Sequence, residues 1–176
     1  MKQFSLLLFL IFLFSCNSVN DNGEKDYLKA VSRKSINRSK YELQYPSDWK
    51  INTADKDFDI DGYFSIEAPE DNALSMFFIF NTSINEEEYL EDQVQAQLNK
   101  TLKNGQVLYF DHWGSFTGHG AVIKGKFLGV SGGELKIFCH SNDSASFLTV
   151  TQYLNKHEEE VMPGFRLIET SFKLKK

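Results

Sequence analysis

Residues 74–80, Leu-Ser-Met-Phe-Phe-Ile-Phe, are soon followed by a segment with a different period, and this change decides the fold class. An apolar run of this length is typical of a central strand that is covered on both faces. Beyond residue 85, apolar residues recur at every fourth position, with acidic residues before them and Asn104-Gly105 after them. Acidic residues suit the positive end of a helix dipole, and Gly commonly ends a helix. The pattern predicts a helix over 85–103.

Strands with a period of two lie on both sides of this helix. Before it, alternating apolar residues predict strands at 41–45, 49–51 and 64–68. After it, we expect strands at about 106–113, 120–129, 134–140 and 146–154. Short turn sequences separate these four: Gly118-His119-Gly120, Ser131-Gly132-Gly133 and Ser141-Asn142-Asp143. Consecutive strands joined by such short turns must be antiparallel.

A second helix is expected at the end of the sequence, because Phe165, Ile168 and Phe172 have helical spacing. Proline disfavours helix at the residue before it, so we place the start of this helix at Pro163. A helix that is kinked at Pro163 and begins near Lys156 is the alternative. The order of elements predicts an α+β fold: an antiparallel sheet of about seven to eight strands sandwiched between two helices on opposite faces.

The amino terminus has the pattern of an export signal. Lys2 precedes an apolar run over 6–14, which is too short to span a bilayer and fits the apolar region of a signal peptide. Leu13-Phe14-Ser15-Cys16 then resembles a bacterial lipobox, which implies that the thiol of Cys16 carries a lipid and that cleavage occurs just before it. The alternative is an ordinary secretory signal with an incidental Cys.

Three segments follow from this pattern. We expect a lipoprotein signal peptide at 1–15, a flexible tether at 16–40 that is rich in Asn, Ser, Lys and Asp, and one folded domain at 41–176. The predicted location is the cell envelope, anchored through Cys16. The outer membrane is favoured, since Asn17 is not the Asp that favours inner-membrane retention in enteric bacteria.

Three segments of the domain also carry a resemblance to a known family. Tyr41-Glu42-Leu43-Gln44-Tyr45-Pro46-Ser47-Asp48-Trp49, Phe64-Ser65-Ile66-Glu67-Ala68-Pro69 and the closing Ser171-Phe172-Lys173-Leu174 resemble the PsbP-like domain family over about residues 40–176. The resemblance implies an α/β/α sandwich, shared with Mog-type Ran-binding proteins and some bacterial lipoproteins. It also implies a role in binding or assembling other proteins, and it transfers no catalytic residues.

Two motifs suggest chemistry. Gly129-Val130-Ser131-Gly132-Gly133 matches G-x-S-x-G, but a nucleophile elbow needs a helix after the Ser, and the residues after Ser131 predict another strand. Asp55, Asp57, Asp59 and Asp61 are spaced by two, as in a calcium loop. The Gly fits only a frame that lacks the final Glu, so we expect a solvated loop, with weak cation binding as the alternative.

The remaining candidates are weaker still. His112, His119, His140 and His157 lack the spacing of a zinc motif, and Cys139 shares an apolar face with Leu135 and Ile137, so its thiol should be buried and should form no disulfide. Asp143-Ser144-Ala145 resembles an acceptor for serine-linked glycosylation. Net charge is −5, which argues against a nucleic-acid partner.

We therefore expect a membrane-anchored lipoprotein whose non-catalytic domain binds a protein partner in the envelope and needs no cofactor. Two hypotheses of other classes stay open. One is a small serine hydrolase that uses Ser131. The other is a module that binds a small ligand or a divalent cation through the Asp55–Asp61 loop.

Overall fold

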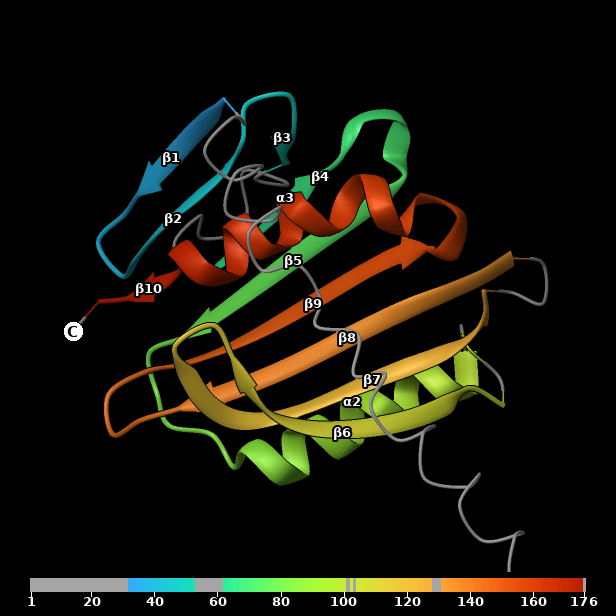
Figure 1. Ribbon diagram of the computed structural model, residues 1–176. Helices are drawn as coiled ribbons and strands as arrows, with labels where there is room; N and C mark the ends of the chain where they lie inside the picture. The colour runs from blue at the N-terminus through green and yellow to red at the C-terminus, as the bar shows by residue number, and fades with distance from the viewer. Residues whose placement is uncertain (1–31, 53–61, 101, 103, 128–130, 176) are drawn as a thin grey trace, which may run out of the picture. The chain divides into compact units, whose positions relative to one another are not determined.

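The computed structural model of the chain describes residues 32–52, 62–100, 102, 104–127 and 131–175. Seven antiparallel strands form the main sheet (Figure 1). In spatial order they are β3 (Lys50–Asn52), β4 (Tyr63–Glu67), β5 (Ala73–Phe80), β9 (Ser146–Leu154), β8 (Ser131–Ser141), β7 (Phe116–Phe127) and β6 (Gln106–Trp113). Strands β6 to β9 follow one another as hairpins, as the short turns predict.

A second, three-stranded sheet covers part of the first. It consists of β1 (Arg33–Asn37), β2 (Tyr41–Pro46) and β10 (Lys173–Leu174), with β2 in the middle. The expectation that the tether reaches residue 40 is wrong for residues 33–37, because β1 pairs along the whole of β2. In β1 only Ile36 is buried, so its sequence has the polar composition of a tether.

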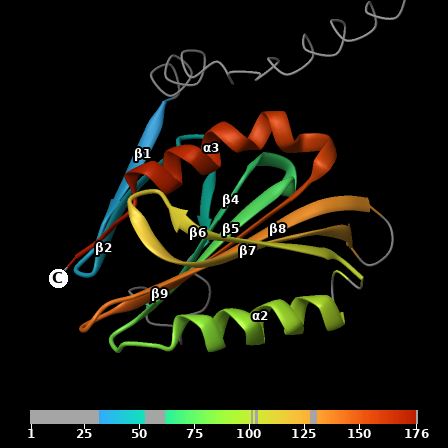
Figure 2. The same cartoon turned by 60° about the horizontal axis from the view of Figure 1, so that its bottom comes forward.

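The two helices lie on opposite faces of the main sheet, as expected (Figure 2). Helix α2 (Glu86–Lys100) packs on β7 and β8, and helix α3 (Glu158–Ser171) packs on β2 and β9. Short 3₁₀ turns, η1 (Pro69–Asp71) and η2 (Asn155–His157), precede β5 and α3. None of the helices in the described part of the chain has the length and hydropathy that crossing a bilayer requires.

Helix α2 begins at Glu86, one residue after its predicted start, and ends at Lys100, three residues before its predicted end. The Asn85 side chain accepts a hydrogen bond from the Glu88 backbone N–H and donates one to the Glu88 carboxylate. This reciprocal pair satisfies an N–H group that a helix start leaves unpaired. Asn104 has a positive φ of 59° and lies beyond the helix, in the turn that leads to β6, where the Gly105 N–H donates to the Leu102 carbonyl at 2.9 Å.

Helix α3 begins at Glu158, so the predicted start at Pro163 is wrong and the alternative start near Lys156 is closer. Pro163 lies inside the helix, in its second turn. The lost hydrogen bond is the one to the carbonyl of Glu159, four residues earlier. Glu159 is exposed, so water can replace the missing donor.

Two predicted turns are also misplaced. Gly118-His119-Gly120 lies within β7, and the hairpin turn comes earlier, at Gly114 and Ser115. A Cβ on Gly120 would clash with the Phe110 ring, which lies flat over this residue. Glycine at 120 therefore permits close packing within the sheet. Ser131 to Gly133 likewise belong to β8, whereas Asn142 and its neighbours form the predicted turn between β8 and β9.

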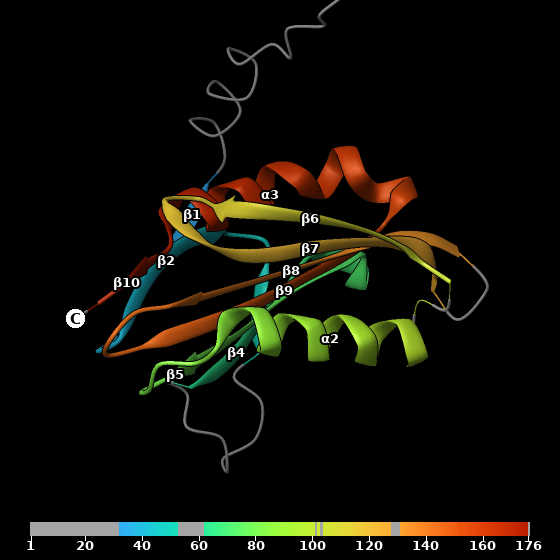
Figure 3. The ribbon, with the colours of Figure 1, turned by 90° about the horizontal axis from the view of Figure 1, so that it is seen from below.

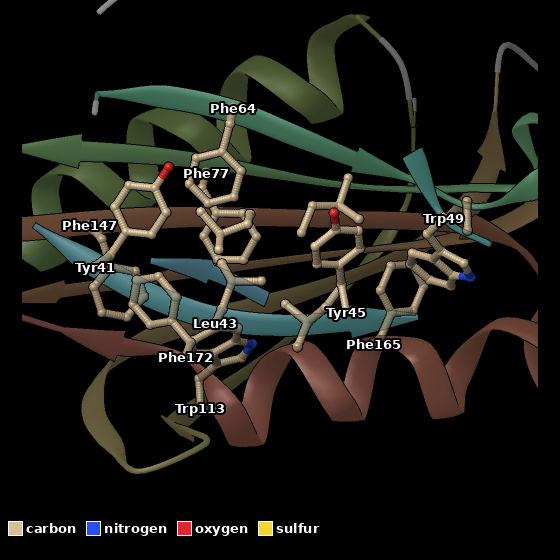
Figure 4. Close-up of a cluster of buried hydrophobic side chains, with 14 of the residues drawn as sticks. Tyr41, Leu43, Tyr45, Trp49, Phe64, Phe77, Trp113, Phe147, Phe165 and Phe172 are labelled. Carbon is tan, nitrogen blue, oxygen red and sulfur yellow. The ribbon is translucent and has the colours of Figure 1, made fainter. Parts of the chain in front are cut away.

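Two apolar cores fill the layers, and the alternation along β9 separates them. Phe147 and Tyr153 face α3, whereas Leu148 and Val150 face α2. The core under α3 is largely aromatic (Figure 4). Tyr41 stacks on Phe64 at 4.7 Å between ring centroids. These layers confirm the expected α+β fold with an antiparallel sheet between helices, although β2 belongs to the second sheet.

Candidate functional site

Several candidates from the sequence lie outside the described residues. These are the lipid-attachment candidate Cys16 and the acidic loop residues Asp55, Asp57, Asp59 and Asp61. Among the residues that are described, no three His, Cys, Asp or Glu side chains gather as a metal site would require.

Ser131 is followed by a strand, so it does not lie in a nucleophile elbow. It is the first residue of β8 and pairs with Phe127 of β7 in an antiparallel ladder. A nucleophile elbow instead joins a strand to a helix, so that the Ser side chain stands above the sheet. The hypothesis of a serine hydrolase loses its geometric basis.

Cys139 is buried, as predicted, in the core under α2. Burial raises the pKa of this thiol to about 12, and the negative charge of Glu86 is the second, smaller cause. His119 is its cross-strand partner, but a thiol with such a pKa is protonated near neutral pH and is a poor nucleophile. His140 points to the other face, where its Nδ1 donates to the Thr117 carbonyl at 2.8 Å.

Two hollows flank the β1–β2 hairpin. One, of about 300 Å³, has Tyr41 and Phe64 in its lining, but these rings are only 2% and 1% exposed and offer a ligand almost no apolar surface. The other, of about 360 Å³, is lined partly by Ser171, whose hydroxyl accepts the Gln44 N–H at 2.8 Å and donates within α3. That hydroxyl is occupied in holding α3 to β2, so we assign this hollow a structural role.

The strand β6 is the most unusual surface in the described part of the chain. Its adjacent residues Leu108 and Tyr109 are the large apolar side chains that are exposed there, at 48% and 63%. They lie on opposite faces of an edge strand that pairs only with β7. Figure 3 shows β6 along the rim of the sheet, between the layers of α3 and α2.

On the face toward α2, Tyr109 meets an acidic helix. Its hydroxyl donates to Glu91 Oε2 at 3.1 Å, and the other oxygen of Glu91 accepts from Gln95 Nε2 at 2.8 Å. Desolvation first, and then the hydrogen bond to Glu91, raise the pKa of Tyr109. The hydroxyl therefore stays a neutral donor, and Glu91 is held beside the strand as a fixed negative charge.

On the face toward α3, Phe110 forms the floor. Its ring stacks on Phe138 at 5.9 Å, and Lys136 Nζ lies 5.0 Å from its centroid. Glu169 of α3 pairs with Lys136 at 3.2 Å and accepts the Gly114 N–H at 3.0 Å, which ties the β6–β7 turn to the helix. Lys136 is thus paired with a carboxylate, as is Lys124 on the same face, which lies 2.8 Å from Glu134.

We define the β6 edge as Leu108, Tyr109 and Phe110 together with Glu91. Its groups suit binding: a sheet edge that no other described strand pairs with, apolar surface on both faces and a hydrogen-bonded carboxylate. Sequence reasoning missed it, although Leu108-Tyr109-Phe110 interrupts the alternation expected of a half-buried strand. That interruption was the available signal, but it does not say which strand lies at the sheet edge.

Comparison with known proteins places the fold but not the function. No family model matches the chain, and no curated protein matches it by sequence. Among solved structures, Mog1p, the Ran-binding protein of Saccharomyces cerevisiae, aligns with a TM-score of 0.53 at 8% identity, over 82% of this chain and 96% of its own. LpqN of Mycobacterium tuberculosis, involved in cell envelope biogenesis, gives 0.51 at 13% identity, over 86% and 96%.

A protein of Bacteroides thetaiotaomicron VPI-5482 aligns with a TM-score of 0.53 at 10% identity, over 81% of this chain. This chain spans about half of that protein, 48% of its length. At such low identities these matches establish the fold alone. They confirm the fold that the sequence resemblance implied, the one shared with Mog-type Ran-binding proteins.

Proposed function

We propose that this protein is a lipoprotein of the cell envelope, anchored through Cys16, whose PsbP-like domain binds a partner protein and performs no chemistry. The lipobox-like Leu13-Phe14-Ser15-Cys16 supports the anchor. The observation that carries the binding role is the β6 edge, where a sheet edge that no other described strand pairs with coincides with two exposed apolar side chains. Mog1p binds Ran and LpqN is involved in envelope biogenesis, which is in keeping with such a role on this fold.

The physics of the anchor is simple. A single acyl chain holds a protein to a membrane only marginally, whereas a lipoprotein Cys carries at least two chains, and each buried methylene adds about 0.8 kcal/mol. The chain has a net charge of −5, so attraction to anionic lipid does not substitute for the lipid. We propose the outer membrane as the location, because Asn17 follows the Cys.

Membrane fractionation tests the anchor. Wild-type protein should sediment with membranes, resist a high-salt wash and follow outer-membrane markers on a sucrose gradient. The Cys16→Ser variant should be soluble or remain an unprocessed precursor. Cys139→Ala is the matched control, since it removes the other Cys and should leave the location unchanged. An unmodified Cys16 in the mature wild-type protein, found by mass analysis, would refute the anchor.

Crosslinking in intact cells tests the binding role. The wild-type protein should yield a discrete adduct with an envelope protein, identified by mass spectrometry and reproduced when that protein is itself the bait. If no adduct forms from the correctly located protein, the binding role is wrong.

A further inference from the structure

Four strands of the described residues lie at sheet edges, and three of them are protected against unwanted pairing by short length or by charged side chains. Strand β3 has three residues and β10 has two, and very short edges recruit no partner. Strand β1 presents Arg33 and Lys34, both exposed, and charged side chains blunt an edge. Strand β6 has eight residues, Gln-Val-Leu-Tyr-Phe-Asp-His-Trp, without Lys, Arg or Pro. A register shift between Phe110 and His112 interrupts its pairing with β7, so the regular part of this edge is Gln106 to Phe110.

An added strand would place its side chains in a defined pattern. Residues of a strand alternate between the two faces of a sheet, so every second side chain of the newcomer would lie beside Tyr109 and Glu91. The intervening side chains would lie beside Leu108 and Phe110 on the opposite face. The first set meets negative charge and the second meets apolar surface.

The charge of the α2 side is strongly one-sided. Helix α2 carries five acidic residues, Glu86, Glu87, Glu88, Glu91 and Asp92, against Lys100 alone. Glu87, Glu91 and Gln95 follow one another at intervals of four and so share the side of the helix that reaches Tyr109. Asp111 of the strand is exposed, but its carboxylate already contacts His112 Nδ1 at 2.7 Å, so the charge of this side comes from the helix. A basic side chain is therefore the complement of this side.

We infer that the β6 edge binds an extended segment of a partner protein by strand addition, and that this segment alternates basic residues, facing α2, with apolar residues, facing Leu108 and Phe110. The inference rests on the proposed function for the nature of the partner as an envelope protein. Backbone hydrogen bonds supply affinity in this mode, and the alternating side chains supply selectivity.

A second copy of this chain is the less suitable occupant. Antiparallel pairing of β6 with its own copy would generate one continuous sheet with both α2 helices on the same face. Those helices would bring two sets of acidic residues toward each other, and like charges that meet across an interface oppose association.

The test uses the full chain, purified from the fraction in which it is found, and a labelled synthetic octapeptide that alternates Lys and Val. We expect saturable binding, observed by fluorescence anisotropy, that weakens as salt rises, because the contacts with Glu91 are exposed. A peptide that alternates Glu and Val should bind at least about tenfold more weakly. Peptides with N-methyl groups on every second residue, in either register, separate strand pairing from simple charge attraction, and one register should lose binding.

Variants of the protein locate the surface. Glu91→Lys and Leu108→Lys should each weaken binding of the Lys/Val peptide by about tenfold. Asp92→Lys is the matched control, because it makes the same kind of charge change one residue along α2, rotated by about 100° away from Tyr109. Equal loss from Asp92→Lys and Glu91→Lys would overturn the inference, since binding would then follow only the net charge of the helix.

Amide hydrogen exchange, read residue by residue by NMR, supplies the decisive structural readout. Bound peptide should slow exchange at alternate amides of β6 and leave the amides of α2 unchanged. Peptide binding without protection of β6 overturns the inference. So does a free protein that sediments as a dimer with β6 already protected, because the occupant would then be a second copy of this chain.

Failure of this inference is distinguishable from failure of the proposed function. If Glu91→Lys and Leu108→Lys form the same crosslinked adduct in cells as the wild-type protein, the binding role stands and the surface is wrong. If the wild-type protein forms no adduct in cells, the binding role fails whatever the peptide does.

Discussion

The two faces of the main sheet are packed with different kinds of side chain. Under α3, eleven of the nineteen buried core residues are aromatic, whereas the ten under α2 are aliphatic, apart from one Cys. The α3 face is closed by elements far apart in the sequence, β2 near the start of the domain and Phe172 at its end. Large aromatic rings fill the space between α3 and the main sheet, whereas smaller aliphatic side chains fill the space between α2 and strands β7 and β8.

This difference predicts unequal consequences for neighbouring residues of one strand. Phe147 and Leu148 are both buried in β9 but point to opposite faces. Phe147→Ala should lower the free energy of unfolding by about 3–5 kcal/mol, because it removes a packed ring. The centroid of this ring lies 4.9 Å from that of Phe116 and 4.8 Å from that of Phe172. Leu148→Ala should cost less, about 2–3 kcal/mol. Urea unfolding of the pair measures both, and a larger cost for Leu148→Ala would contradict the comparison.

Gly164 tests how tightly the aromatic layer is filled. A Cβ at this position would lie 2.9 Å from Cε2 and Cη2 of Trp49, so the ring would have to move. Gly164→Ala should destabilise the protein by about 1–3 kcal/mol through overpacking, despite the better helix propensity of Ala. Glu159→Ala, exposed on the same helix, should change stability by about 0.5 kcal/mol or less. A stabilised Gly164→Ala protein would show that the layer is loosely packed.

The α2 face offers a test by pH. The folded pKa of Cys139 is raised from 9.0 to about 12, so the native state holds the thiol proton more tightly than the unfolded state does. The contribution of this group to stability is therefore present below about pH 9 and is lost as the pH rises toward 12. Cys139→Ser should cost about 1–2 kcal/mol at neutral pH. That deficit should shrink in alkaline solution, and rapid labelling of the native thiol at pH 8 would refute its burial.

Removal of one buried hydroxyl in the aromatic layer should make the protein more stable. The hydroxyl of Thr149 is buried and has no hydrogen-bond partner within the described residues, although Ser75 and Thr151 nearby pair with each other at 3.3 Å. Thr149→Val keeps the shape and removes an unsatisfied polar atom, so it should raise stability by about 1 kcal/mol. Thermal unfolding measures the gain. A loss of stability would indicate that the hydroxyl has a partner, such as a buried water.

The smallest effect on stability is expected at the β6 edge. Leu108 is 48% exposed, and Leu108→Lys should change the free energy of unfolding by about 0.5 kcal/mol or less. The same substitution should weaken binding of the Lys/Val peptide. A large loss of stability would place Leu108 in the core and would remove the reason for regarding it as a binding residue.

How far the sequence could predict this structure depended on whether the decisive contacts were local. Helix α2 and the strands of the hairpins from β6 to β9 follow from the period, because their partners are adjacent in the chain, although only the turn between β8 and β9 lies where its residues predict it. Strand β1 was missed, since its pairing with β2 buries only Ile36 and leaves no pattern. The start of α3 was misplaced because packing of Val161 in the core favours helix on both sides of Pro163.

The binding site was missed for a different reason. The acidic run of α2 and the apolar triplet of β6 are both visible in the sequence, but each alone has an ordinary interpretation as a solvated face or a core strand. They form a binding surface only because β6 is the last strand of the sheet and because Glu91 of α2 hydrogen-bonds to Tyr109 of β6. Those are properties of the sheet order.

Site-specific photocrosslinking in living cells compares the two longest open edges most directly. The photoreactive amino acid p-benzoylphenylalanine is placed at Leu108 of β6 in one protein and at Lys34 of β1 in another, both exposed positions of edge strands. We predict an adduct with a single envelope protein from position 108, lost when Glu91→Lys is added, and none from position 34. An adduct from position 34 with none from position 108 would contradict the assignment of β6 as the binding edge.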